Sequence, residues 1–268
     1  MKRIIWVTAV WLMLWELLSL AVRNPVLLAG PAETAGALFM LVRDPVFWVS
    51  AGRSLLRIIG GWITGSALGI LCAALSVRFP VFGDLLSPAV TVLKAIPVAS
   101  FVVLVLIWTG SANLSLIITA LVSFPILYFN TREGILGADR KLLEMAAVFG
   151  VPFGKRVRSI YLPGLMPFLM SAAELSVGMC FKSGVAAEVI GQPRYSLGNG
   201  LYRAKITLAT AEALAWTAAV VFFSWLFTGL VRAFSARLSG GRYVKRAAGN
   251  AEKAEKAEKA DEAGRSAV

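Results

Sequence analysis

Residues 58–77 read IIGGWITGSALGILCAALSV, a run of twenty residues without a charged side chain. A helix needs about 20 mostly apolar residues to cross the hydrocarbon core of a bilayer. Gly61, Gly65 and Gly69 recur every fourth residue, so they share one face of such a helix. In lipid, a face of small residues lets two helix backbones approach closely. We predict a membrane-spanning helix whose glycine face packs on protein, either inside this chain or at a subunit interface or moving pathway.

Five further apolar stretches have the same character. They cover residues 4–22, 95–109, 114–129, 165–190 and 213–231. Two of them are short for a span, so 95–109 either borrows length from the apolar residues 85–93 or is tilted together with 114–129. The first begins Met-Lys-Arg, as a signal peptide would, but it is longer than a signal core and lacks a clean cleavage site, which favours a retained span. The expected fold is all-α: a polytopic membrane protein of about six transmembrane helices.

The composition points to the same class. The chain has 268 residues, of which 58% are hydrophobic and 16% charged, with a mean hydropathy of +0.74. Soluble domains are about 45–50% apolar and about 25% charged. The chain has no histidine, which excludes Ser-His-Asp catalysis and imidazole metal sites. Cys72 and Cys180 both lie in apolar stretches, so neither a disulfide framework nor a catalytic or metal centre is expected.

The net charge of +12 suggests a nucleic-acid partner only until its distribution is considered. The basic residues lie between the apolar runs, where lysine and arginine mark the cytoplasmic side of a membrane protein. If both termini are cytoplasmic, fifteen of the 27 basic residues fall on the inner side: Lys2, Arg3, Arg78, Lys94, Arg132, Arg140, Lys141, Lys155, Arg156, Arg158, Arg232, Arg237, Arg242, Lys245 and Arg246. Seven fall outside: Arg23, Arg43, Arg53, Arg57, Arg194, Arg203 and Lys205. The remaining five are Lys182, inside a span, and four residues of the distal tail. We therefore predict a multi-pass protein of a bacterial plasma (inner) membrane, in contact with lipid and not nucleic acid, with both termini in the cytoplasm.

Three regions follow from this reading. Residues 1–46 hold the first span and a segment, 31–42, whose apolar positions suit a short amphipathic helix on the outer face. Residues 47–235 form the transmembrane domain. Residues 236–268 form a basic tail that ends in three Ala-Glu-Lys repeats, without an apolar face, and is expected to be disordered or a solvated helix.

The longest polar segment between spans, residues 131–163, carries the most specific pattern. Residues 142–149 are good helix formers, and Gly150 followed by Pro152 ends the helix as a C′ glycine and a following proline do. Pro163 suits the first turn of the next helix. A short, basic helix-turn-helix on the cytoplasmic face is expected, because a plain connecting loop needs no stiff helix with small residues on it.

The spacing of this segment resembles the EAA loop of ABC importer permeases. The positions in register are Glu144, Ala146, Ala147, Gly150, Ile160, Leu162 and Pro163, while Met145 replaces the usual alanine. Three other stretches are similar to the nitrate/sulfonate/taurine type of binding-protein-dependent permease. They are Ser54-Leu55-x-Arg57-x-x-x-Gly61 with Gly69, Pro88 with Lys94-Ala-Ile-Pro97 and Trp108-Thr-Gly110, and Gly184-Val-Ala-Ala-Glu188-Val-Ile-Gly191. The resemblance covers residues 47–234.

The resemblance implies a permease that works as a dimer, most simply with a second copy of itself. Two cytoplasmic ATPase subunits would bind the EAA loops, and a binding protein or lipoprotein would deliver solute at the outer face. Such families carry nitrate, sulfonates, taurine or thiamine precursors. The chain has no Gly-x-x-x-x-Gly-Lys-Ser/Thr phosphate loop, so it is expected not to be an enzyme or to hold a cofactor, and ATP and Mg²⁺ would belong to the partner ATPase.

Charged residues inside spans are costly and are candidates for function. Glu174, Lys182 and Glu188 lie on the stretch 165–190 or its end. They form either ion pairs between spans or part of a solute pathway, and a pathway lysine would suit an anion. Glu188 is expected at the membrane–water interface because Gln192-Pro193-Arg194 follows. Glu16 is one candidate partner for Lys182.

Two other classes of function fit the sequence less well than the importer. An ion-coupled secondary transporter usually shows internal repeats and broken helices. No repeat is visible in this chain, and six spans are few for that class. A membrane enzyme would need a convergent set of acids or cysteines, and the sequence shows none.

The topology can be tested with a cysteine placed at Ser159, within the basic segment 131–163. We expect this cysteine to react with a membrane-impermeant thiol reagent only after the cells are opened, because the basic segment should stay on the cytoplasmic side. Labelling in intact cells would reverse the assigned orientation.

Overall fold

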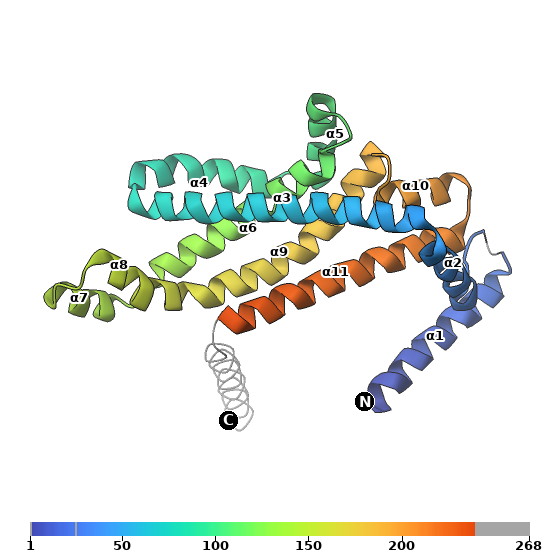
Figure 1. Ribbon diagram of the computed structural model, residues 1–268, viewed down its shortest axis with the longest axis horizontal. Helices are drawn as coiled ribbons and strands as arrows, with labels where there is room; N and C mark the ends of the chain where they lie inside the picture. Colours follow the sequence, from blue (N-terminus) through green and yellow to red (C-terminus); the bar gives the residue numbers. More distant parts are fainter. Residues whose placement is uncertain (1, 25, 239–268) are drawn as a thin grey trace, which may run out of the picture.

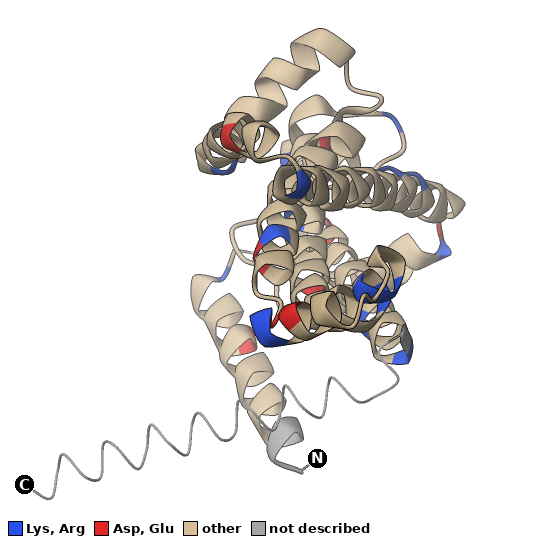
Figure 2. Cartoon of the chain, turned by 90° about the vertical axis from the view of Figure 1, so that its left-hand side faces the viewer, with Lys and Arg blue, Asp and Glu red and all other residues tan. Residues whose placement is uncertain are grey.

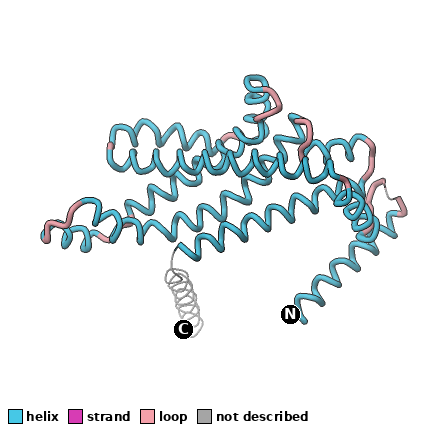
Figure 3. Tube along the Cα trace, viewed as in Figure 1, coloured by secondary structure: helices cyan, strands magenta, loops and turns pink. Residues whose placement is uncertain are grey.

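A computed structural model describes residues 2–24 and 26–238 of the chain, and side chains from residue 6 onward. The expected tail from residue 239 onward lies outside the described residues. Within them the chain forms helices joined by short turns, with no strand (Figures 1 and 3). The helices are α1 (Lys2–Val22), α2 (Pro31–Arg43), α3 (Pro45–Arg78), α4 (Pro80–Ala95), α5 (Val98–Thr109), α6 (Leu114–Leu136), α7 (Arg140–Val148), α8 (Phe153–Arg156), the π-helical turn η1 (Val157–Tyr161), α9 (Leu162–Gly191), α10 (Leu197–Ile206) and α11 (Thr210–Leu238).

Four continuous helices in the described part are long and apolar enough to cross a membrane. They are Pro45–Arg78, Leu114–Leu136, Phe153–Gly191 and Thr210–Arg237. The described part of α1, Trp6–Val22, is a shorter apolar helix. Charged side chains occupy few positions along the long helices (Figure 2). The all-α, polytopic class expected from the sequence is confirmed.

The stretch 95–109 is not the single span that the sequence suggests. α4 runs back alongside α3 over about half the length of α3 (Figure 1). The chain then bends by 103° between α4 and α5. The break lies at Ile96 and Pro97, where Ile96 adopts an extended conformation with ψ 132°. Proline lacks a backbone N–H and disfavours the helical conformation of the residue before it, so the helix cannot continue. Together α4 and α5 make at most one bent span, which brings the count to five.

The glycine face of α3 packs on α6. A Cβ at Gly61 would overlap Thr119 and the carbonyl of Leu116, and a Cβ at Gly65 would overlap Ser123 and the carbonyl of Ala120. At Gly69 it would lie 2.6 Å from the carbonyl oxygen of Phe124. Three successive turns of α3 therefore touch the backbone of α6, which only glycine permits.

The third helix of the core, α9, crosses both others. Gly184 of α9 lies at the crossing, where a Cβ would be 2.8 Å from both Ile58 of α3 and Thr119 of α6. Trp62 donates from Nε1 to Ser176 Oγ on α9 at 2.8 Å. α11 closes one side of this core through Trp216, Ala219 and Phe223. Small and hydroxyl-bearing side chains at the crossings match the way helices associate in lipid, through close packing and hydrogen bonds.

α1 stands away from this core and is held at one end (Figure 1). Trp15 donates from Nε1 to the carbonyl of Ala29 at 3.0 Å, and Ser19 donates to the carbonyl of Leu28 at 2.9 Å. Glu16 points toward Gly30, the residue before α2. The suggested pairing of Glu16 with Lys182 is therefore wrong, because these contacts hold this end of α1 beside the start of α2.

Replacing Gly65 with alanine should lower the midpoint of thermal unfolding in detergent, because the added methyl group collides with the α6 backbone. Overpacking of this kind costs about 1–3 kcal/mol. Gly60→Ala is the matched control on the same helix, since a Cβ there meets only Leu116 Cδ1 at 3.7 Å. Equal stability of the two variants would contradict the α3–α6 contact.

Candidate functional site

Residues 137–161 connect α6 to α9 and contain the short helices α7 and α8 and the π-helical turn η1. They lie at one end of the molecule, which we call the tip (Figure 1). Asp139 caps α7 by accepting from the Lys141 N–H at 2.9 Å. The helix ends where Gly150 adopts φ +62°. Val151 N–H donates to Ala146 and Gly150 N–H to Ala147, at 2.9 and 3.1 Å, the two bonds of a Schellman motif. The helix expected at 142–149 and its stop at Gly150 are both present.

The residues predicted from the sequence in this connection fall in two places and differ in exposure to solvent. Ala146 is buried, whereas Glu144, Ala147 and Gly150 are exposed at the tip. Ile160 and Pro163 are half-buried and Leu162 is exposed, at the point where the chain enters α9.

Large apolar side chains at the tip are exposed as well. Val148, Phe149 and Phe153 are 84%, 76% and 73% exposed. They lie beyond the apolar part of the long helices, next to charged residues such as Lys155. An exposed apolar patch with a polar rim is typical of a protein-binding surface. We refer to Val148, Phe149 and Phe153 as the tip patch.

The tip is joined directly to the core. Residues Phe153–Gly191 form one continuous 39-residue helix that contains α8, η1 and α9. Arg156 donates from Nε to the carbonyl of Val151 at 2.6 Å, which ties the turn after α7 to this helix. The tip and α9 are therefore joined by one continuous helix, with no loop between them. We refer to this helix, Phe153–Gly191, as the rod.

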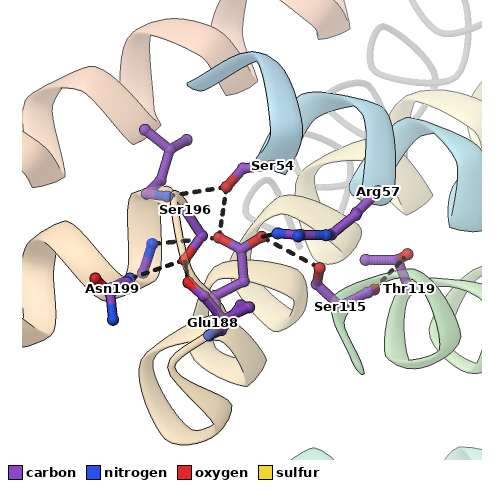
Figure 4. Close-up of polar contacts among 10 residues, drawn as sticks. Ser54, Arg57, Ser115, Thr119, Glu188, Ser196 and Asn199 are labelled. Carbon is purple, nitrogen blue, oxygen red and sulfur yellow. Dashed lines mark hydrogen bonds and ion pairs between the residues drawn. The ribbon is translucent and has the colours of Figure 1, made fainter. Parts of the chain in front are cut away.

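At the opposite end of α9, Glu188 is fully buried among four helices (Figure 4). Its carboxylate accepts from Ser54 Oγ of α3 at 2.7 Å and from Ser115 Oγ of α6 at 3.2 Å. Arg57 of α3 approaches with Nη1 3.8 Å from Oε1. The Gly198 N–H, in the first turn of α10, donates to Oε2 at 3.2 Å.

The same cluster satisfies the start of α10. Leu197 N–H donates to Ser54 Oγ at 2.9 Å, and Asn199 N–H donates to Ser196 Oγ at 3.0 Å. With the Gly198 bond, three N–H groups that a helix N-terminus leaves unpaired all have partners. A carboxylate is also favourable at that positive end of the helix dipole. Glu188 thus links α3, α6, α9 and α10.

Glu188 lies three residues before the end of α9, as expected for a residue near the membrane–water interface, but it is buried in protein and not exposed. The chain does leave the helix at Gln192, but Gln192 adopts a left-handed conformation with φ 48°. This turn folds α10 back over the end of α9 and covers the carboxylate. Ser54 and Ser115 were not predicted as its partners, although a carboxylate within an apolar segment is itself a signal that polar partners exist.

The other two charged residues of α9 have different surroundings. Glu174 pairs with Arg232 of α11 through two hydrogen bonds of 2.9 and 3.2 Å. Lys182 is exposed, and within the described part of the chain no carboxylate pairs with it. The structure therefore separates the three residues: two are engaged within the protomer and one is available.

A polar hollow of about 470 Å³ lies beside α10, at the end of the molecule away from the tip. Its lining includes Asp44, Arg194, Arg203, Glu212 and Trp216. Tyr195, also in the lining, lies under the Arg53 guanidinium at 4.9 Å. The lining contains both cationic and carboxylate side chains, so the hollow suits a polar protein surface or a polar solute.

Residues 65–240 match the family model of the binding-protein-dependent transport system inner membrane component. The chain belongs to this family. The match includes most of the helical core, the α6–α9 connection and α10, and it confirms the resemblance to binding-protein-dependent permeases. The permease is thus a multi-pass component of an inner membrane, and an ion-coupled secondary transporter is set aside.

The chain is similar to individual permeases that are named for different solutes. It is 27% identical over 188 residues to SsuC of Bacillus subtilis, a permease assigned to aliphatic sulfonate transport, covering 68% of this chain and 67% of that one. It is 23% identical over 231 residues to the taurine transport system permease TauC of Escherichia coli, covering 84% of each. The riboflavin transport permease RibX of Chloroflexus aurantiacus is 22% identical over 218 residues, covering 79% of this chain and 80% of its own.

Two solved structures share the fold. A chain of the MetNI methionine ABC transporter in inward-facing conformations aligns with a TM-score of 0.54 at 16% identity, covering 76% of this permease and 96% of that chain. A chain of a bacterial ABC transporter involved in import of the acidic polysaccharide alginate aligns with a TM-score of 0.59 at 15% identity, covering 89% and 98%.

Removing the buried carboxylate should destabilise the permease strongly. Glu188→Ala leaves Ser54, Ser115 and the first turn of α10 without the acceptor of their hydrogen bonds, and each buried polar group left unsatisfied costs about 1–3 kcal/mol. We expect a lower unfolding midpoint in detergent and earlier proteolysis at α10. Glu133→Ala, an exposed carboxylate on α6, is the control and should change little. A Glu188→Ala protein as stable as the control would contradict the structural role of the cluster.

Proposed function

We propose that this permease is the membrane subunit of an ATP-driven importer and that two cytoplasmic ATPase subunits bind its α6–α9 connection. The observation that supports this most directly is the tip: a capped helix and the tip patch are exposed and are continuous with the rod Phe153–Gly191. The tip patch offers apolar contacts, and Glu144 on the exposed side of α7 offers a charge for a basic residue of the partner.

In this proposal the permease contributes a docking surface and a bistable bundle, and no catalytic group. Closure of the ATPase dimer around ATP and Mg²⁺ would displace both tips. The rod would carry the displacement to α9 in the core, and the solute cavity would switch between its two openings. The close α3–α6 contact would let those two helices move as one body while α9 shifts against them.

The remaining partners follow the orientation inferred from the basic residues. With both termini and the tip on the cytoplasmic side, the hollow beside α10 faces outward. A binding protein would deliver solute there, and a second copy of the permease would complete the pathway. The relatives named for sulfonates and taurine support a small organic or inorganic anion as solute, while riboflavin transport by another relative keeps a larger heterocycle, or a thiamine-precursor-like solute, within the range.

Charge reversal at Glu144 tests the docking surface. We expect Glu144→Lys to reduce solute uptake and co-purification of the ATPase by roughly tenfold or more, because like charges across an interface cost several kcal/mol. Membrane insertion should be unchanged, since Glu144 is exposed and has no role in the core. Glu133→Lys on α6, outside the connection, is the matched charge reversal. Normal uptake with Glu144→Lys would reject the assignment of this surface.

Gly150→Pro tests the geometry of the tip. Proline is restricted to φ near −65° and lacks an N–H. The position requires φ +62° and uses its N–H to bond Ala147, so α7 should lose its ending and its orientation. We expect a larger loss of ATPase binding than with Glu144→Lys. Gly154→Ala, four residues on and with open space around the added methyl group, should retain binding. Retained binding in both variants would show that α7 orientation is unimportant.

A further inference from the structure

A groove of about 320 Å³ runs along the core where the helix break, α6 and α9 meet. Ile96 and Val98 line it at the break, Val122 and Pro125 from α6, and Leu175 and Met179 from α9. The groove is apolar along its length except for Lys94, which is part of its lining. Lys182 is not in the lining; it lies three residues beyond Met179 on the same face of α9.

Lys182 belongs to the exposed stripe of α9. Leu175, Met179, Lys182 and Ala186 are spaced by three or four residues and are all exposed. Lys182 lies nine residues before the end of α9 at Gly191, or about 13 Å along the helix axis. Side chains on a helix lean toward its N-terminus, so the ammonium group is directed deeper into the span and away from the nearer end.

Lys94 is also well inside the span. Val90, one turn earlier on α4, packs in a cluster with Ala73 and Tyr128, which places Lys94 near the level of Gly69 in the middle of the apolar run 58–77. This lysine was counted with the inner basic residues, and its depth comes from the return of α4 alongside α3. Its ammonium lies 5.5 Å from the centroid of the Phe129 ring, and no carboxylate in the described residues pairs with it.

Contact with lipid is unfavourable for the surface around this groove. A lysine at the centre of a bilayer costs about 2.5–3.5 kcal/mol on insertion scales. Lys94 lines the groove, and Lys182 lies three residues beyond Met179 on the exposed face of α9. The break at Ile96 and Pro97 also interrupts the helical hydrogen bonds at membrane depth. Non-helical backbone there is tolerated where it is buried in protein or lines a water-filled cavity. Lys94 and the break line one groove, and the α9 side of that groove continues to Lys182, so a single aqueous path would satisfy all three.

We propose that this groove is a wall of the solute pathway and that Lys94 and Lys182 make the pathway selective for anions. The proposal rests on the proposed function, because only a transport subunit needs such a path. A sulfonate or similar anion would pass from one ammonium group toward the other, with its organic part against the apolar side chains between them. The buried Glu188 lies on another face of α9 and is held by Ser54 and Ser115, so it does not neutralise Lys182.

Thiol labelling at Met179 tests this without knowledge of the natural solute. A Met179→Cys variant would be made in a chain whose native cysteines are replaced (Cys72→Ser, Cys180→Ala) and reconstituted with its ATPase in liposomes. The probes are two water-soluble methanethiosulfonates of similar size, one with a sulfonate group and one with a trimethylammonium group. Trp225→Cys, on an exposed apolar position of α11, is the control for a lipid-facing site.

We expect Met179→Cys to react with both probes and Trp225→Cys with neither. The anionic probe should react faster at Met179→Cys, and Lys182→Met should lower the ratio of anionic to cationic rates by about tenfold, the effect of one unit charge a few ångströms away in water. Lys182→Arg should keep the ratio, and Lys94→Met should lower it in the same direction.

Two results would overturn the proposal. No labelling of Met179→Cys in a complex that hydrolyses ATP would show that the groove is closed to water, and a ratio unchanged by Lys182→Met would show that the lysine does not select anions. Co-purification and ATP hydrolysis report on the proposed function, whereas labelling reports on the groove. Each can therefore fail while the other holds.

Discussion

The close contact between the backbones of α3 and α6 is the constraint on which the other helices depend. At Gly61, Gly65 and Gly69 the absence of a Cβ brings the two helices together over three turns. The pair presents Ile58 and Thr119 to the outside at one point, where Gly184 of α9 fits. Without the glycine contact, α9 would meet two separate helices and not a single ridge. In lipid, where the hydrophobic effect does not drive helices together, such packing has to be supplied by shape and hydrogen bonds.

α9 gains its place from both of its ends. At one end it is continuous with the turn that carries α7, and at the other Glu188 joins it to α3, α6 and the start of α10. A force applied at the tip would reach the helix that carries Lys182 without passing through a flexible loop. The buried carboxylate anchors the other end of that helix to α3, α6 and α10. In the proposed importer, one helix would thus serve docking, anchoring and contact with the pathway.

The bent pair α4–α5 has a different physical origin. Proline ends α4 after 16 residues, too few to cross a bilayer, and the chain then turns sharply. The break leaves polar backbone near the middle of the apolar run of α3, beside Lys94. Such an element is costly in lipid and stable only against protein or water, which supports the proposal that this face borders the solute pathway.

Much of the fold was predictable because the local composition of a segment is enough to indicate a membrane helix. The apolar runs, the glycine spacing in α3, and the stop of α7 at Gly150 depend on residues close in sequence, and the all-α membrane class followed from them. The family followed from the residue spacing between Glu144 and Pro163 and from three further local stretches. The partners of Glu188 were not predictable. Ser54 and Ser115 lie 134 and 73 residues away, and which hydroxyl meets the carboxylate depends on how three helices cross. The separation of Glu174, Lys182 and Glu188 into paired, exposed and buried residues likewise required the neighbours of α9. Sequence alone determined that charges occur within spans at a cost in free energy. The tertiary structure decided which charges are compensated inside the protomer and which are left to meet water or solute, because only the crossing of the helices brings a partner to each charge.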